Sequence, residues 1–430
     1  MRAQCLALEL LLMFSSLVAA DCVQTQESEA VSRAHALVLE DRLDAAEQVL
    51  NSVLARAPRE ASALNLLGTI RGRQQRFEDA EKLFRKALNS RPGMLSASQN
   101  LALLYSTQGR SAEAIQELER AAGLNRESKA CKVERKDLSL QLASLYEQTG
   151  QLAEAEAQYL STLQVYPNSV ETLRRLARLK SNDGEHVKAA EYLYRALEIA
   201  PNSEQLLYEY GLATLKAGSP METVRALAAA TRLNPNASQY QYGLGLAYLE
   251  VGDPISATDP LAKTAKLEPG KFLNHLALGT AYSARKQYEN AKEVLQRCLT
   301  LDPGQPEALY LMAEIADAEN ELPRAEELAR RGLVREPNHP GANLVLGSVL
   351  LKRGDLKGAQ RALELAEKID SSSPKIHYQL SHLYARLNDH ARSELELQAY
   401  QSALKQSSEH LESVRRLLQF NLPESQPIAK

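Results

Sequence analysis

The sequence repeats with a period of 34 residues. Small residues return at this interval early in the chain, at Ala34, Gly68 and Ala102. After a slip of seven residues, the series resumes at the same interval with Ala143, Ala177, Gly211, Gly245, Gly279, Ala313, Gly347 and Ser381. Eleven units in series predict a repeat array, in which each unit contacts its neighbours. Function is therefore expected from a surface rather than from an enclosed catalytic pocket.

Each unit is predicted to form two amphipathic helices joined by a short turn. In residues 272–303, Leu278 and Tyr282 lie at helical spacing in the first half, and Ala291, Leu295 and Cys298 do so in the second. Another small residue follows twelve positions after the first one, as at Ala46, Ala80, Ala114, Ala155, Ala189, Ala257, Ala291, Ala325 and Ala359. Small residues at these two positions allow the paired helices to approach closely, because larger side chains would overpack the contact.

Glycine and proline mark the turns. Between the two helices, many units carry a glycine suited to the left-handed conformation that ends a helix: Gly109, Gly150, Gly184, Gly218, Gly252 and Gly354. A proline that stops the second helix closes most units: Pro58, Pro92, Pro167, Pro201, Pro235, Pro269, Pro303 and Pro337.

Spacing, small residues, aromatic positions and closing prolines together resemble the tetratricopeptide repeat family over residues 27–405. The resemblance implies an all-α, right-handed superhelical solenoid whose first helices line a concave face. We expect about eleven helix-turn-helix repeats plus a C-terminal capping helix. The repeats are expected near 27–60, 61–94, 95–135, 136–169, 170–203, 204–237, 238–271, 272–305, 306–339, 340–373 and 374–407.

The two ends of the chain do not follow the repeat. Residues 1–20, with Arg2, an apolar run and a small-residue ending at Ala20, resemble a secretory signal peptide, and 21–26 form a short linker. The chain is therefore expected to be exported, periplasmic or secreted; a cytoplasmic protein is the alternative if 1–20 is not a signal. Lipidation of Cys22 is another alternative, which Asp21 disfavours. Residues 408–420 are predicted to be the capping helix, and 421–430 a flexible tail.

Composition excludes some classes of partner. The chain has 51 Lys and Arg against 54 Asp and Glu, a net charge of −3, which argues against a nucleic-acid or anionic-membrane binder. No segment of the mature chain is expected to span a membrane. Without the signal peptide, Cys22, Cys131 and Cys298 remain, an odd number that cannot all pair within one chain. Cys298 is predicted to be a buried packing residue.

The seven extra residues fall within 126–136, a stretch with five basic and two acidic side chains. Seven residues make about two helical turns, so the insertion can lengthen the flanking helices without breaking the stack. Two interpretations of this stretch remain: a solvated helix extension, and a contact site for an acidic partner.

No motif supports catalysis, a cofactor or a metal. His377 and His382 are five residues apart, a poor spacing for two ligands on one helix face. The family's carboxylate clamp is absent, because Asn65, Thr69 and Asn100 lack the accompanying cations. We therefore predict that the chain is not an enzyme.

Binding is better supported than chemistry. If the family geometry holds, the fifth residue of the first helix faces the concave side, which places Tyr208, Tyr242, Leu276, Tyr310 and Tyr378 there. Arg174 and Arg178 would form a basic patch on this face, and Glu314 belongs to an acidic one. Tyrosine suits recognition, although it is also an ordinary residue at this position in the family.

The predicted function is a non-catalytic scaffold that binds a protein or peptide on its concave face, in assembly of an envelope or secretion complex. The alternative is a carbohydrate- or polymer-binding accessory protein of polysaccharide export. The sequence identifies neither the partner nor the oligomeric state.

Overall fold

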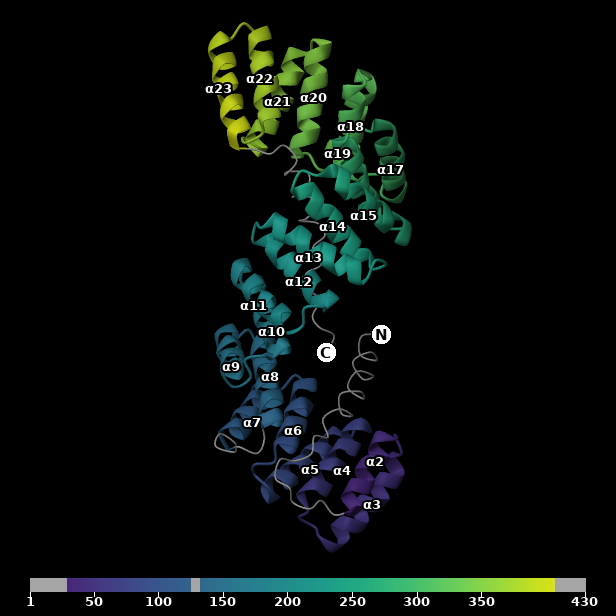
Figure 1. Ribbon diagram of the computed structural model, residues 1–430, viewed down its shortest axis with the longest axis vertical. Helices are drawn as coiled ribbons and strands as arrows, with labels where there is room; N and C mark the ends of the chain where they lie inside the picture. Colours follow the sequence, from purple (N-terminus) through teal and green to yellow (C-terminus); the bar gives the residue numbers. More distant parts are fainter. Residues whose placement is uncertain (1–28, 125–131, 407–430) are drawn as a thin grey trace. The chain divides into compact units, whose positions relative to one another are not determined.

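The computed structural model describes residues 29–124 and 132–406 (Figure 1). These residues form twenty-two α-helices and no β-strand, which confirms the all-α repeat fold. The predicted signal peptide, the linker at 21–26, the capping helix at 408–420 and the tail at 421–430 lie outside the described residues.

The helices fall into two compact units, divided between Glu185 and His186, inside the predicted repeat 170–203. The first unit holds α2 (Glu29–Leu39), α3 (Leu43–Arg56), α4 (Ala61–Arg73), α5 (Phe77–Ser90), α6 (Leu95–Thr107), α7 (Ser111–Leu124), α8 (Lys132–Gln148), α9 (Leu152–Val165) and α10 (Val170–Asn182). The second holds α11 (His186–Ile199), α12 (Glu204–Lys216), α13 (Pro220–Leu233), α14 (Ser238–Glu250), α15 (Pro254–Leu267), α16 (Phe272–Ala284), α17 (Tyr288–Leu301), α18 (Pro306–Ala318), α19 (Leu322–Arg335), α20 (Pro340–Arg353), α21 (Leu356–Ile369), α22 (Pro374–Arg386) and α23 (His390–Gln406).

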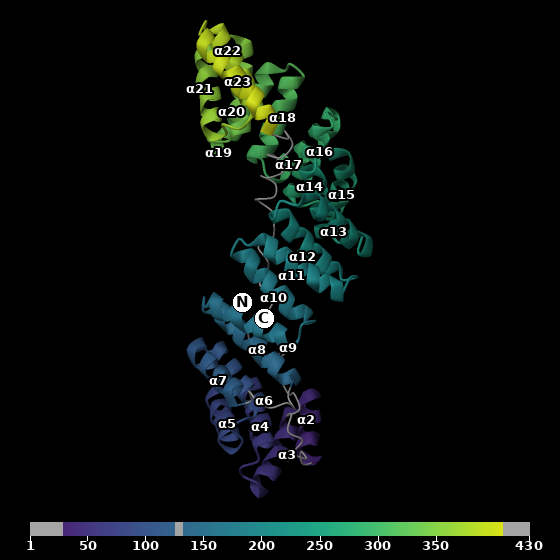
Figure 2. The ribbon, with the colours of Figure 1, turned by 60° about the vertical axis from the view of Figure 1, so that its left-hand side comes forward.

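Within each unit, consecutive helices pack as hairpins that follow one another along the chain (Figure 2). The even-numbered helices are the first helices of the repeats and are called A helices here; the odd-numbered ones are called B helices. An A helix also packs against the next A helix, as α16 does on α18 and α18 on α20. The A helices from α2 to α8 in the first unit, and from α12 to α22 in the second, therefore each form a continuous row.

The turn from A helix to B helix has the same backbone conformation in every repeat. Its glycines have φ between 74° and 86°, at Gly109, Gly150, Gly184, Gly218, Gly252 and Gly354. The remaining repeats place other residues there in the same left-handed region, with φ from 55° to 62°, at Asp41, Gln75, Lys286, Asn320 and Asn388. The glycine preference predicted from sequence is thus confirmed. Of the five other residues, Asp and Asn tolerate this region better than Gln75 and Lys286 do.

Proline acts at both ends of the helices. Pro58 follows the end of α3 by two residues, and Pro235 follows α13 in the same way. Proline is also the first residue of five helices, where its missing N–H costs nothing: Pro220, Pro254, Pro306, Pro340 and Pro374 start α13, α15, α18, α20 and α22. Pro323 is the second residue of α19.

Small residues on the A helix bring it close to a large residue on its own B helix. A Cβ atom added to Gly279 would lie 2.5 Å from Leu295 Cδ2, and one added to Gly68 would lie 2.6 Å from Phe84 Cε1. Leu295 and Phe84 are fully buried. The close approach predicted from the 34-residue spacing is therefore confirmed. The large residue that contacts the small one lies sixteen positions after it in the sequence.

The seven-residue insertion lengthens α8, which has 17 residues where the other A helices from α4 onward have 13 or 14. The preceding helix, α7, keeps the 14 residues of an ordinary B helix. Residues 126–131 of the predicted basic stretch lie outside the described residues.

Cys298 packs in the core of the second unit with no exposed surface. Burial raises the pKa of its thiol to about 12. Its predicted packing role is confirmed.

Candidate binding face

Four tyrosines occupy the fifth residue of an A helix in the second unit: Tyr208 in α12, Tyr242 in α14, Tyr310 in α18 and Tyr378 in α22. Because they share a position in the repeat, their side chains leave the A helices on the same face. Tyr208, Tyr242 and Tyr310 are half-buried, and Tyr378 is 43% exposed. We call these four residues the tyrosine row.

The first and third members of the row rest on rings from the neighbouring repeat. The ring of Tyr208 lies 5.0 Å from that of Tyr240, at 44°. Burial raises the pKa of Tyr208 to about 12, so its hydroxyl stays protonated and can donate a hydrogen bond. Tyr310 lies 5.2 Å from the ring of His339. Both tyrosines are thus held in place by these rings and by the core against which they pack.

Gly341, at the start of α20, provides the space for Tyr310. A Cβ atom at this position would lie 2.7 Å from Cε2 of the tyrosine ring. The glycine therefore fixes how closely the ring approaches α20, because any side chain there would push it outward.

Tyr378 is the most accessible member of the row. Its ring meets His382, one turn later in α22, edge to face at 4.4 Å, and lies 5.6 Å from Tyr400 of α23. Edge-to-face and tilted aromatic pairs stabilise such an arrangement while leaving ring surface exposed.

Leu276, predicted to lie on the same face, is different. It is the fifth residue of α16 but is only 2% exposed, as a member of the core cluster of the second unit. Its side chain therefore packs in the core and offers almost no surface to a partner.

The basic patch predicted in α10 is engaged within the first unit. Arg178 Nη2 donates to Glu147 Oε2 of α8 at 2.6 Å, and Arg175 Nε donates to Glu171 Oε1 at 2.7 Å. Arg174 is half-buried. At least two of these guanidinium groups thus connect or stiffen A helices rather than standing free in solvent.

The acidic residues of α18 are also paired. Lys375 Nζ of α22 lies 3.2 Å from Glu314 Oε1, and Lys352 Nζ of α20 lies 2.7 Å from Asp317 Oδ1. Glu307 Oε2 lies 2.9 Å from His339 Nε2. Lysines of the next two A helices therefore balance the charges of Glu314 and Asp317, while Glu307 accepts a hydrogen bond from His339.

Asn65 and Asn100, the two asparagines considered for a carboxylate clamp in the sequence, form a hydrogen bond with each other. Asn100 Nδ2 donates to Asn65 Oδ1 at 3.1 Å, and Asn65 Nδ2 donates to Ser96 Oγ at 3.5 Å. Asn65 and Asn100 are at most 4% exposed. Their amides join α4 to α6, in agreement with the sequence argument against the clamp.

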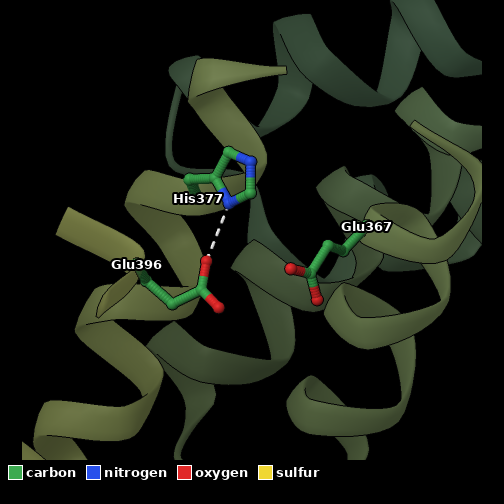
Figure 3. Close-up of side chains that lie close together, drawn as sticks. All are labelled: Glu367, His377 and Glu396. Carbon is green, nitrogen blue, oxygen red and sulfur yellow. Dashed lines mark hydrogen bonds and ion pairs between the residues drawn. The ribbon is translucent and has the colours of Figure 1, made fainter. Parts of the chain in front are cut away.

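The structure assembles one polar cluster that the sequence search missed, in which Glu367 of α21, His377 of α22 and Glu396 of α23 converge (Figure 3). Burial lowers the pKa of His377, but hydrogen bonds to Glu396 and Ser371 outweigh it and the net pKa is raised. Burial, and then the charge of Glu396, raise the pKa of Glu367. Ten and nineteen residues separate the members, so no local motif marks them.

Over the described ranges, no helix combines the length and apolar character that a membrane span requires.

No curated protein matches the chain. Solved structures that resemble it include MamA, at 24% identity over 39% of this chain and 92% of that one, with a TM-score of 0.38. The Cut9–Hcn1 hetero-tetramer of the APC/C matches at 12% identity over 95% and 99%, with a TM-score of 0.46. YrrB, described as a TPR protein with an unusual peptide-binding site, matches at 20% identity over 44% and 95%, with a TM-score of 0.40.

Family models give the identification. Four tetratricopeptide repeat models match residues 59–127, 136–179, 208–264 and 282–348, which together make up more than half of the chain. The matches fall in both compact units and on the helix pairs described above. The chain belongs to the tetratricopeptide repeat family.

Proposed function

We propose that this chain is a non-catalytic scaffold that binds a protein or peptide against the tyrosine row. The observation that carries the proposal is the row itself: four tyrosines in one repeat position on the A helices, three half-buried against the core and one exposed. Tyrosine provides apolar area and a hydrogen-bonding hydroxyl with little entropy to lose, which is why it is common at binding hot spots.

The charges on the A helices contribute less to this binding. An acidic partner at α10 would compete with Glu147 for Arg178, and a basic partner at α18 would compete with Lys375 for Glu314. Such paired charges affect orientation and encounter rate more than affinity. We therefore assign the affinity to the tyrosines, and to Arg174, Arg178 and Glu314 the orientation of the partner.

We further propose that the scaffold acts outside the cytoplasm, in assembly of an envelope or secretion complex. The support is the apolar run near Arg2 and its ending at Ala20, which are typical of a signal peptide. The test is N-terminal sequencing of the protein recovered from fractionated cells. A chain that begins at residue 21 in the exported fraction agrees with the proposal, and an intact Met1 in the cytoplasmic fraction refutes it.

The binding proposal is tested by cross-linked capture of partners with the full chain and with a variant in which Tyr242, Tyr310 and Tyr378 are changed to Ala. Tyr208 is left unchanged because it packs on Tyr240. We expect the parent to capture a partner that the triple variant loses. Circular dichroism must show the same helix content for both chains.

Tyr194 supplies the matched control. It lies on the B helix α11 and is 54% exposed, more than any member of the row. Tyr194→Ala should capture the same partner as the parent. Equal capture by the parent and the triple variant, or loss of capture with Tyr194→Ala, would show that the row is not the binding face.

A further inference from the structure

Three consecutive helices near the end of the second unit each contribute one ligand-type side chain to a single point. Glu367 lies in the last turn of α21, His377 in the first turns of α22, and Glu396 near the middle of α23 (Figure 3). One donor atom from each lies within 4.8 Å of the others. His377 is 6% exposed, so the cluster is built into the packing rather than spread over the surface.

Both ring nitrogens of His377 make hydrogen bonds to oxygen acceptors. Nε2 lies 3.0 Å from the carbonyl oxygen of Ser371 in the turn before α22. A carbonyl oxygen only accepts, so Nε2 must be the protonated donor. Nδ1, at 2.7 Å from Glu396 Oε2, faces the carboxylates and donates its own proton to Glu396 when that group is ionised.

A histidine that binds a metal through one nitrogen commonly donates the other N–H to a backbone carbonyl, which sets the tautomer and the ring orientation. His377 has this arrangement, with Ser371 as the outer partner. His339 shows the contrast, because its Nδ1 accepts from the N–H of Ala342 and its Nε2 faces Glu307. Each ring therefore donates to one carboxylate, but at His377 a second carboxylate, that of Glu367, lies close by, and a cation there would replace the Nδ1 proton.

The surrounding charges favour a cation at this point. Glu364, one turn before Glu367 in α21, accepts a hydrogen bond from the Tyr384 hydroxyl at 3.1 Å and adds negative charge nearby. Arg392, on α23, lies over the Tyr384 ring at 5.4 Å and pairs with Asp389. The arginine is thus engaged away from the Glu367–Glu396 pair.

We propose that Glu367, His377 and Glu396 bind a divalent transition-metal ion of the zinc class. One imidazole nitrogen and two carboxylate oxygens are a donor set that zinc accepts, with bonds of about 2.0–2.2 Å and donors about 3.3–3.5 Å apart in a tetrahedral site. On binding, Nδ1 releases its proton to solvent, the Nδ1–Oε2 contact of 2.7 Å opens slightly, and the Glu367 carboxylate turns toward the ion. A water molecule completes the coordination.

The ion would cross-link α21, α22 and α23. Helices toward the end of a repeat array have fewer neighbouring repeats than central ones and open locally at a lower free energy. A metal that binds only the folded arrangement stabilises it in proportion to its occupancy. The bound ion would thus stabilise the packing of the final described repeat, and this role is independent of the proposed binding function.

The test is a calorimetric titration of the chelator-treated full chain, untagged and with accessible thiols alkylated, with zinc chloride. We expect one equivalent to bind, and hydrogen exchange in α22 and α23 to slow when zinc is added. Glu367→Gln and His377→Gln should each weaken binding at least ten-fold. His382→Gln is the matched control, because this exposed histidine of α22 should not change the affinity.

Glutamine keeps the shape of Glu367, so a folding defect is not expected, and circular dichroism of each variant checks this. No stoichiometric binding to the parent overturns the proposal, and so does equal affinity of the parent and Glu367→Gln. Loss of binding in His382→Gln alone also overturns it, because the ion would then sit at the surface. In each of these cases, His377 serves as an ion-pair partner of Glu396.

Discussion

Replacing Gly279 by alanine tests the helix contact that defines the repeat. The added Cβ would lie 2.5 Å from Leu295 Cδ2 and 2.7 Å from its Cγ, whereas carbon atoms pack best at about 3.5–4.0 Å. Leu295 has no exposed surface, so it cannot move aside into solvent. Relieving the overlap costs about 2–3 kcal/mol. Alanine regains about 1 kcal/mol as the better helix former, which leaves a net loss of about 1–2 kcal/mol.

Two variants separate these opposing effects. Gly123 lies within α7 with no heavy atom within 4 Å of an added Cβ, so Gly123→Ala should show only the gain, at most about 1 kcal/mol. In a Leu295→Ala background the overlap is absent, and Gly279→Ala should become stabilising by up to about 1 kcal/mol. The coupling between the two sites is therefore expected to reverse the sign of the effect.

Hydrogen exchange of the amides in α16 and α17 is the appropriate assay, because repeat arrays need not unfold as one cooperative unit. It reports the free energy of opening for this helix pair, and urea unfolding supplies the global value. If Gly279→Ala has the same sign in both backgrounds, the contact with Leu295 does not explain why a small residue occupies this position.

Three further changes follow from the same structure. Lys286→Gly should stabilise the chain by about 0.5–1 kcal/mol, because Lys286 has a φ of 55°, while Gly252→Ala, at 75°, should destabilise it by about as much in urea unfolding. Cys298 should resist thiol reagents until the chain unfolds, because it is buried with a pKa of about 12, and Cys298→Ser should lower stability by about 1–3 kcal/mol. The hydrogen bond from Arg71 lowers the pKa of Glu47, so the ionised carboxylate stabilises the fold above the unfolded-state pKa. This contribution is lost as the pH falls through the lower folded-state pKa. Glu47→Gln should therefore be less stable than the parent near neutral pH, and its stability should approach that of the parent at acid pH, as measured by circular dichroism.

The repeat framework was predictable from sequence because it depends on local constraints. A left-handed turn, a small residue and a helix-ending proline each impose a residue type at one position, and Gly252, Gly279 and Pro269 show these three features in neighbouring repeats. The repeated spacing then fixes which helices form hairpins. These features required no knowledge of distant contacts.

The candidate site was less predictable because position in a repeat gives the face of a helix but not its exposure. Leu276 shares the position of Tyr242 and is nevertheless buried in the core. Lys375 neutralises Glu314 from 61 residues away, which depends on how three A helices stack. Charge patterns read from single helices therefore overestimated the free charge on this face.

The cluster at His377 shows the same limit. Its members come from three helices, and the spacing of His377 and His382 within one helix argued against a metal site. Only the packing of α21, α22 and α23 brings the two carboxylates to Nδ1. A search for ligand pairs on a single helix cannot find such a site.

The most direct test of the tyrosine row is site-specific photo-cross-linking in cells that produce the full chain. A benzophenone amino acid is placed at Tyr378 in one variant and at Tyr194 in another, since both residues are exposed, at 43% and 54%. The account predicts a discrete cross-linked protein or peptide from position 378 and none from position 194. Cross-links to the same partner from both positions, or from position 194 alone, would contradict it.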